Sequence, residues 1–320
     1  NAGLEVVEQP IIVVAGPTAS GKSRAALDVA EEFGGAVINA DSMQVYRELD
    51  ILSARPDICQ TARVPHLLYG FMPAAQACSA GRWLEMAAAA VSEVRAMGRI
   101  PVFAGGTGLY IKALTEGLAP VPEIPDEIRT RARALHQELG GERFRDRLAA
   151  LDPQAASDLP AGDTQRLIRA FEVMQATGRT LKEWQAEHPS SPPIEGVFAS
   201  VVLIPPRDAL YATINTRFSR MMEGGALDEA RALFSLGLDA GLPAMKALGV
   251  RELVRHLRGE TELEQAVELA MRGTRQYAKR QFTWLRHQIE GSYVVSAQYS
   301  ESKKEKIFSF IRQFLLTAQS

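Results

Sequence analysis

The chain has very few cysteines. Only Cys59 and Cys78 occur among its 320 residues, they are far apart, and neither belongs to a cysteine or histidine cluster. This scarcity excludes a disulfide framework and a cysteine-ligated zinc site, and it favours a reducing compartment. We interpret both cysteines as small buried or neutral residues.

An excess of one charge and long apolar segments are also missing. The formal net charge is −2 and the pI is near 6.3, so nucleic-acid binding must rest on local patches. No apolar run approaches the length of a membrane span, and residues 1–10 lack the pattern of a signal peptide. We therefore expect a cytoplasmic protein with no membrane partner. A hydrophobic content of 46% is ample for a sizeable core.

A phosphate-binding loop is the most informative motif that is present. The template G-x-x-x-x-G-K-[ST] is filled directly after an apolar, β-branched run at 11–15 and before a helical pattern at 24–30. Glycines let successive N–H groups point inward, the lysine adds a positive charge, and the serine hydroxyl suits Mg²⁺. The predicted loop residues are Gly16, Pro17, Thr18, Ala19, Ser20, Gly21, Lys22 and Ser23.

The surrounding pattern predicts an α/β fold. Further strand-like segments occur at 36–40, 100–104, 200–204 and 292–296, and helical patterns lie between them. This alternation indicates a parallel sheet with helices on both faces. Prolines at 120, 122 and 125, and again at 189–193, bound a charge-rich helical stretch. We predict a catalytic core over 10–118 and 198–320 with an inserted all-helical domain over 119–197.

Candidate catalytic residues follow two of these strands. The strand at 100–104 ends in Gly105-Gly106-Thr107-Gly108 without the acid that many phosphate-loop enzymes use for Mg²⁺, which weakens an ATPase or kinase reading. Asp41 is the nearest strand-end carboxylate, and it suits either a general base or a cap of the following turn. Thr107 lies between glycines, so it suits close approach to a ligand or simply the start of a helix.

Basic residues also stand out. Arg166 and Arg169 share one side of a predicted helix with Gln165, which suits either an RNA backbone or a solvated face. In the stretch 272–286, five cations alternate with Tyr277, Phe282 and Trp284, as in single-stranded RNA recognition, although several of the aromatic residues should face a core. Arg217 follows the strand at 200–204 closely enough to return to the phosphate site.

Taken together, these motifs resemble the tRNA dimethylallyltransferases, also called tRNA isopentenyltransferases, over roughly residues 11 to 290. The ordered anchors are the segments 16–23, 41–47, 64–66, 105–110, 165–169 and 275–286. The resemblance implies that the loop and Arg217 bind the diphosphate of dimethylallyl diphosphate, with Mg²⁺ at Ser23. It further implies alkyl transfer to the exocyclic amine of the adenosine on the 3′ side of the anticodon, with Asp41 as general base and Thr107 contacting the reacting nucleotide.

The resemblance also implies a set of residues that bind the tRNA anticodon stem-loop, and we expect a monomer. The set is Asp41, Ser42, Met43, Gln44, Thr107, Arg129, Gln165, Arg166, Leu167, Ile168, Arg169, Lys246, Arg251, Arg275, Lys279 and Arg280. Met43 departs from the family's usual arginine, and Val250, in the segment with Lys246 and Arg251, replaces its usual aromatic residue.

Three alternatives remain open from the sequence. An adenylate isopentenyltransferase would act on free AMP, ADP or ATP and needs no second domain. A small-molecule kinase would use the same loop for ATP. An RNA-binding module with a vestigial loop would not need Lys22, Ser23 and Asp41 intact.

Overall fold

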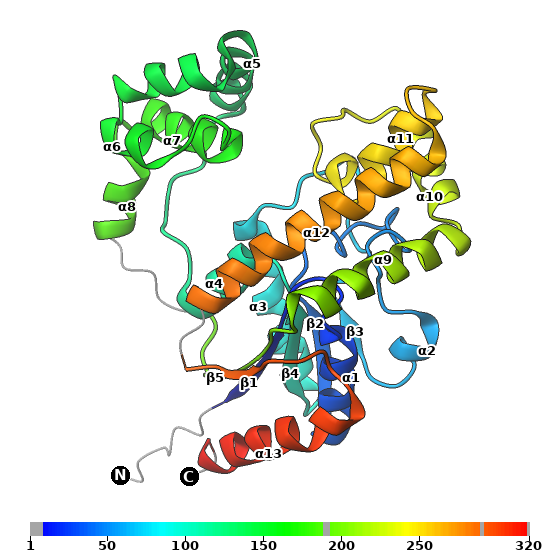
Figure 1. The fold of residues 1–320 in the computed structure, drawn as a ribbon. Helices are drawn as coiled ribbons and strands as arrows, with labels where there is room; N and C mark the ends of the chain where they lie inside the picture. The colour runs from blue at the N-terminus through cyan, green and yellow to red at the C-terminus, as the bar shows by residue number, and fades with distance from the viewer. Residues whose placement is uncertain (1–8, 188–192, 289–290, 319–320) are drawn as a thin grey trace, which may run out of the picture. The chain divides into compact units, whose positions relative to one another are not determined.

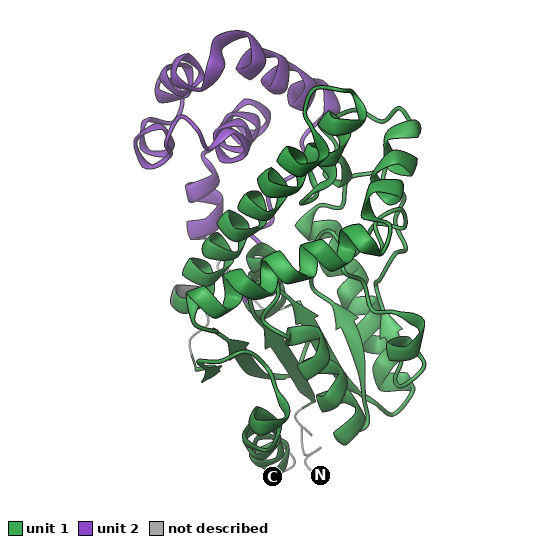
Figure 2. Ribbon diagram, turned by 45° about the vertical axis from the view of Figure 1, so that its right-hand side comes forward, with its two compact units in different colours: residues 1–115, 192–320 green, residues 116–191 purple. Residues whose placement is uncertain are grey.

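The computed structural model describes residues 9–187, 193–288 and 291–318, and the chain divides into two compact units (Figure 2). Unit 1 comprises residues 1–115 and 192–320, and unit 2 comprises residues 116–191. The boundaries expected from the sequence lie at 119 and 197. Within the expected hinge at 189–193, residues 189–192 lie outside the described residues.

Unit 1 is built on a parallel six-stranded sheet with the order β3-β2-β4-β1-β5-β6 (Figure 1). This confirms the predicted α/β class. The strands are β1 (Pro10–Ala15), β2 (Gly35–Asn39), β3 (His66–Leu67), β4 (Ile100–Gly105), β5 (Val197–Leu203) and β6 (Tyr293–Val295).

Helices cover both faces of the sheet because its central strand is apolar on both sides. Ile11 and Val13 of β1 belong to one core cluster with Trp83, whereas Ile12 and Val14 belong to a second cluster with Ile307. This continuous burial is typical of a parallel strand between two helical layers. The helices of unit 1 are α1 (Lys22–Glu32), α2 (Ile58–Thr61), α3 (Ala80–Ala96), α4 (Gly108–Glu116), α9 (Arg207–Glu223), α10 (Ala226–Ser235), the 3₁₀ turn η1 (Ala244–Lys246), α11 (Val250–Leu257), α12 (Leu263–Gln288) and α13 (Glu301–Thr317).

Two short elements were not expected from the sequence. The strand β3 has two residues and pairs Val37 with His66, and α2 has four residues capped by the Asp57 side chain. Neither is long enough to show a period of hydrophobic residues.

Unit 2 is helical and has its own core. Its helices are α5 (Asp126–Ala149), α6 (Pro153–Asp158), α7 (Thr164–Thr177) and α8 (Leu181–Glu187). Phe144, Leu167 and Phe171 are buried together, and the rings of the two phenylalanines lie 5.2 Å apart. Non-helical dihedral angles at Gly140 interrupt α5. In the part of the chain that the structure describes, no helix has the length and apolar character to cross a membrane.

The carboxyl ends of β1, β2 and β4 bring three loops to one edge of the sheet, where α/β proteins bind ligands. Gly105 ends β4 in close contact with the chain after β2. A Cβ atom on Gly105 would lie 2.1 Å from the Ala40 carbonyl oxygen, so glycine is required for the two backbones to meet.

We expect Gly105→Ala to lower the free energy of unfolding by about 1–3 kcal/mol, the usual cost of overpacking. The control is Gly273→Ala in α12, where an added Cβ meets nothing within 4 Å and should raise stability by up to about 1 kcal/mol. Urea unfolding followed by circular dichroism measures both. A Gly105→Ala protein as stable as the parent would contradict the close contact.

Candidate active site

The loop after β1 is shaped by left-handed backbone positions. Ala19 has φ 66° and Gly21 has φ 89°, and Gly21 leads directly into α1. A Cβ on Gly21 would lie 2.8 Å from Cβ of Tyr299, which explains the glycine there. The C-terminal segment supports the loop from outside, because the Tyr299 amide donates to the Ser20 carbonyl and the Gln298 side chain donates to the Ala19 carbonyl. This geometry is typical of an anion-binding turn at a helix N-terminus.

Two cations converge on this loop. Desolvation lowers the pKa of the Lys22 ammonium from 10.5 to about 8, with Asp41 opposing and Arg217 adding to the shift. Burial likewise lowers the pKa of the Arg217 guanidinium, again opposed by Asp41. Arg217 Nη2 donates to the Thr18 hydroxyl, so the expected return of Arg217 to the loop is observed. Both cations lie where the charge of an anionic ligand would compensate for their lost hydration.

Asp41 is fixed in place by the residue at the end of β2. Its amide donates to Asn39 Oδ1 at 2.8 Å, and Asn39 Nδ2 donates to the Asp41 carbonyl at 2.9 Å. Asp41 Oδ1 accepts the Met43 amide at 2.9 Å, which is the turn-capping role considered from the sequence. The same carboxylate acts electrostatically on Lys22 and Arg217. Asp41 therefore caps the turn and also interacts with the two cations.

Thr107 joins the loop after β4 to the loop after β2. Its Oγ1 accepts the Ser42 amide at 2.9 Å and lies 3.3 Å from the Ser42 hydroxyl. Burial, reinforced by Asp41, raises the pKa of the phenol of Tyr277 in α12, and the Thr107 side chain opposes this shift. The glycines on either side of Thr107 allow close packing as well as close approach of a ligand, because Gly108 lies against the Trp284 ring.

Sequence reasoning missed Gln281. This residue of α12 is 5% exposed. Its Oε1 accepts the Thr18 amide at 2.8 Å, and its Nε2 donates to the Gly106 carbonyl at 2.7 Å. The signal was present, because Gln281 lies one helical turn after Tyr277 and shares its face. The basic residues of the 272–286 stretch form a more obvious pattern than the position of Gln281 does.

Several of the expected tRNA-binding residues are engaged in contacts within the protein. Gln44 Nε2 donates to the carbonyls of Ser53 and Ala54, and Arg275 donates to Asn215 and Glu268. These side chains fix a turn and join α12 to α9. In unit 2 the Leu167 side chain is fully buried in the core, so this residue could contact RNA only through its backbone.

Other members of the set have accessible surface. Ser42, Met43, Arg129, Ile168 and Arg169 are partly buried, and Gln165, Arg166, Lys246, Arg251, Lys279 and Arg280 are exposed. In unit 1 the Arg280 guanidinium lies over the Tyr277 ring at 5.6 Å. In unit 2 Arg169 lies 3.9 Å from Glu172, which is almost fully buried. Burial lowers the pKa of Arg169 and raises that of Glu172.

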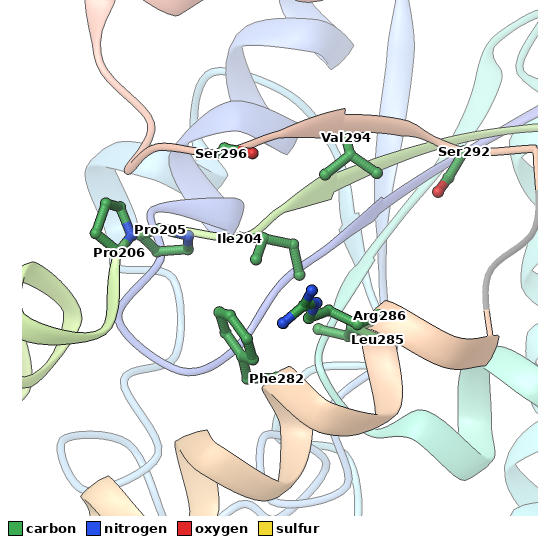
Figure 3. A pocket seen from close by; sticks show the side chains of 9 residues that line it. All are labelled: Ile204, Pro205, Pro206, Phe282, Leu285, Arg286, Ser292, Val294 and Ser296. Carbon is green, nitrogen blue, oxygen red and sulfur yellow. The ribbon is translucent and has the colours of Figure 1, made fainter.

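A separate cavity of about 460 Å³ lies between the C-terminal part of α12 and the strands β5 and β6 (Figure 3). Its walls include both apolar side chains, such as Ile204 and Phe282, and polar ones, such as Ser292 and Ser296. Arg286 reaches over the Phe282 ring at 5.6 Å. Phe282, one of the aromatic residues of the 272–286 stretch, therefore lines a cavity in unit 1 instead of a fully exposed face of the helix.

The donor set near the loop is compatible with Mg²⁺ shared with a phosphate ligand. Among the described residues, no group of three or more His, Cys, Asp or Glu side chains forms a metal cage. Ser23 lies in the first turn of α1, directly after Lys22. A hydroxyl with phosphate oxygens and water is a common environment for Mg²⁺.

Comparisons with known proteins point to one family. A family model described as IPP transferase matches residues 44–288, and one described as isopentenyl transferase matches residues 9–65. A tRNA dimethylallyltransferase of Paramagnetospirillum magneticum is 52% identical over 309 residues, covering 97% of this chain and 98% of the relative. One from Rhodospirillum centenum is 53% identical over 281 residues, covering 88% and 90%.

Solved structures give the same result. The tRNA isopentenylpyrophosphate transferase of Bacillus halodurans has a TM-score of 0.70 at 30% identity, covering 97% of this chain and 98% of that one. A eukaryotic dimethylallyltransferase acting on tRNA shares the fold, with a TM-score of 0.82 at 23% identity over 97% of this chain and 80% of that one. The chain therefore belongs to the tRNA dimethylallyltransferase family, whose members are prenyltransferase enzymes.

Proposed function

We propose that the protein transfers a dimethylallyl group from dimethylallyl diphosphate to the exocyclic amine of the adenosine on the 3′ side of a tRNA anticodon. The observation that carries the proposal is one constellation in unit 1: two desolvated cations at a phosphate loop, with a carboxylate close enough to act on both. An anion site beside a fixed carboxylate suits a reaction in which a diphosphate leaves while a proton is removed.

In the proposed reaction the carbon–oxygen bond of the donor breaks and the diphosphate leaves with the electron pair. The adenosine nitrogen forms the new bond to carbon, and Asp41 accepts the proton that this nitrogen loses. Lys22 and Arg217 stabilise the negative charge that grows on the leaving group. Thr107, which is hydrogen-bonded to the Ser42 amide, is proposed to contact the nucleotide. A base paired or stacked in an RNA loop must flip out to reach such a pocket.

Mg²⁺ is part of the proposal, with the Ser23 hydroxyl as the residue that would hold it. When bound, the ion would neutralise diphosphate charge. The remaining tRNA-binding assignments are also proposed, at Gln165, Arg166 and Arg169 in unit 2 and at Lys279 and Arg280 in unit 1. A monomeric state and a cytoplasmic location stay predictions.

The function is tested by offering the protein Mg²⁺ and radiolabelled dimethylallyl diphosphate with either an anticodon stem-loop or free AMP. We expect label only in the stem-loop that has adenosine 3′ to the anticodon. Label in AMP would instead support the adenylate isopentenyltransferase alternative, and label in neither acceptor would contradict the proposal.

We expect Asp41→Asn to reduce kcat by about 10²–10⁴-fold, the usual contribution of general-base catalysis. The replacement keeps an oxygen to cap the Met43 amide, so the turn should persist. Single-turnover transfer measures the rate, and Glu85→Gln, at an exposed acid of α3, is the control. Transfer at the parent rate would remove Asp41 from the mechanism.

We expect donor affinity to fall at alkaline pH. The Lys22 pKa of about 8 belongs to the ligand-free protein, and a bound diphosphate favours the charged form. Binding therefore takes up a proton above pH 8, and the affinity for dimethylallyl diphosphate should fall about tenfold per pH unit there. Calorimetry without tRNA, compared with Lys22→Arg as a variant that cannot titrate, measures this. An affinity that stays level from pH 7 to 9.5 would contradict it.

We expect Arg169→Ala to weaken stem-loop binding about tenfold, typical of a lost charged hydrogen bond, and to leave donor KM unchanged. The matched control is Arg145→Ala in the same unit, which removes an ion pair with the largely exposed Glu142. Binding over a range of salt concentrations should show a shallower slope for Arg169→Ala alone. If the parent and Arg169→Ala bind RNA with equal affinity, Arg169 belongs to a solvated helix face and does not bind tRNA.

A further inference from the structure

We propose that Gln281 is a positioning residue that sets the spacing between the diphosphate loop and the acceptor loop. The inference rests on the proposed function and concerns the same site. Gln281 is nearly fully buried in α12 and uses both ends of its amide on two different loops.

One end of the amide fixes the diphosphate loop. The Thr18 N–H donates to Gln281 Oε1 at 2.8 Å, while the Thr18 hydroxyl accepts from Arg217. Thr18 is therefore held from two directions, by α12 through its backbone and by α9 through its side chain. Its N–H is committed to the helix rather than to a ligand, so Gln281 orients the loop without touching the diphosphate.

The other end fixes the loop that carries Thr107. Gln281 Nε2 donates to the Gly106 carbonyl at 2.7 Å. A Cβ on Gly106 would lie 2.4 Å from this nitrogen and 2.6 Å from the Gly16 carbonyl oxygen. The two loops thus touch at Gly106, and the glutamine amide bridges them at the point of contact.

The neighbouring turn of α12 strengthens this arrangement. Tyr277, four residues before Gln281, lies beside the Thr107 side chain. Ala278 is fully buried and packs with Leu210 and Ala19 of the loop. At the far end of the helix, Leu285 is buried in the main core. One helical face, anchored in the core, therefore contacts both reacting sides of the site.

A positioning role makes a specific prediction because a transfer reaction depends on the distance between the reacting atoms. Disturbing the bridge should lower kcat while each loop still binds its own ligand. A residue that only shapes the phosphate loop would instead raise donor KM. A residue that only fills the core would lower thermal stability without separating the two constants.

The test is Gln281→Glu, measured for transfer to the stem-loop from pH 6 to 8 and divided by the parent rate at each pH. In its ionised form the new carboxylate accepts a hydrogen bond from the Thr18 amide but has no proton to donate to the Gly106 carbonyl. In its protonated form the carboxyl group makes both hydrogen bonds. Burial and the facing oxygen raise the pKa of such a carboxyl. We expect kcat to fall at least tenfold at pH 8, with both KM values within threefold, and the ratio to the parent to recover at least threefold at pH 6.

Two further variants complete the test. Gln276→Glu adds the same charge at an exposed position of α12 and should follow the parent at every pH. Gln281→Met keeps the size without the hydrogen bonds and should show low kcat with no recovery at low pH. Thermal midpoints confirm that each variant is folded.

The outcomes separate the two claims. A parent protein that does not modify the stem-loop overturns the proposed function. An active parent overturns only the role of Gln281 if Gln281→Glu keeps its kcat, changes donor KM alone, or lacks pH recovery. If Gln281→Glu fails to fold, unchanged kcat in Gln281→Met overturns that role, and a low kcat with unchanged KM values supports it.

Discussion

The site depends on the desolvation of two cations beside one carboxylate. Lys22 and Arg217 lose hydration at the phosphate loop, and burial lowers the pKa of both, while Asp41 offsets part of that cost. A ligand with two phosphate groups would offset the rest. The site thus favours a highly charged anion before any acceptor arrives, and in the proposed reaction the carboxylate that stabilises the free site takes a proton during transfer.

The loops can share one site because three backbones approach without side chains between them. Gly105 lies against Ala40, and Gly106 lies against Gly16. Hydrogen bonds then fix what the glycines allow: Asn39 holds Asp41, Thr107 holds Ser42, and Gln281 joins Thr18 to Gly106. Each loop follows a different strand, so the parallel sheet supplies their common edge and α12 supplies the bridge across it.

Much of the fold was predictable, since β1, α1, β2 and β4 show clear hydrophobic patterns and the phosphate loop has a fixed spacing. Asp41, Thr107 and Arg217 could be named because each follows a strand end. The contacts of Gln281 with Thr18 and Gly106 could not be predicted, because a buried polar contact between residues far apart in sequence leaves no periodic signal. Leu167 was assigned with its arginine neighbours, although its place on α7 turns it into the core of unit 2. The strand β3 was too short for its pairing to show.

The central claim is that the loop holds the diphosphate of a prenyl donor rather than a nucleoside triphosphate. The most direct measurement is a calorimetric titration of the parent protein with dimethylallyl diphosphate and, separately, with ATP, both with Mg²⁺ and without RNA. The account predicts saturable binding of the prenyl donor and much weaker binding of ATP. Tighter binding of ATP, accompanied by its hydrolysis, would contradict it.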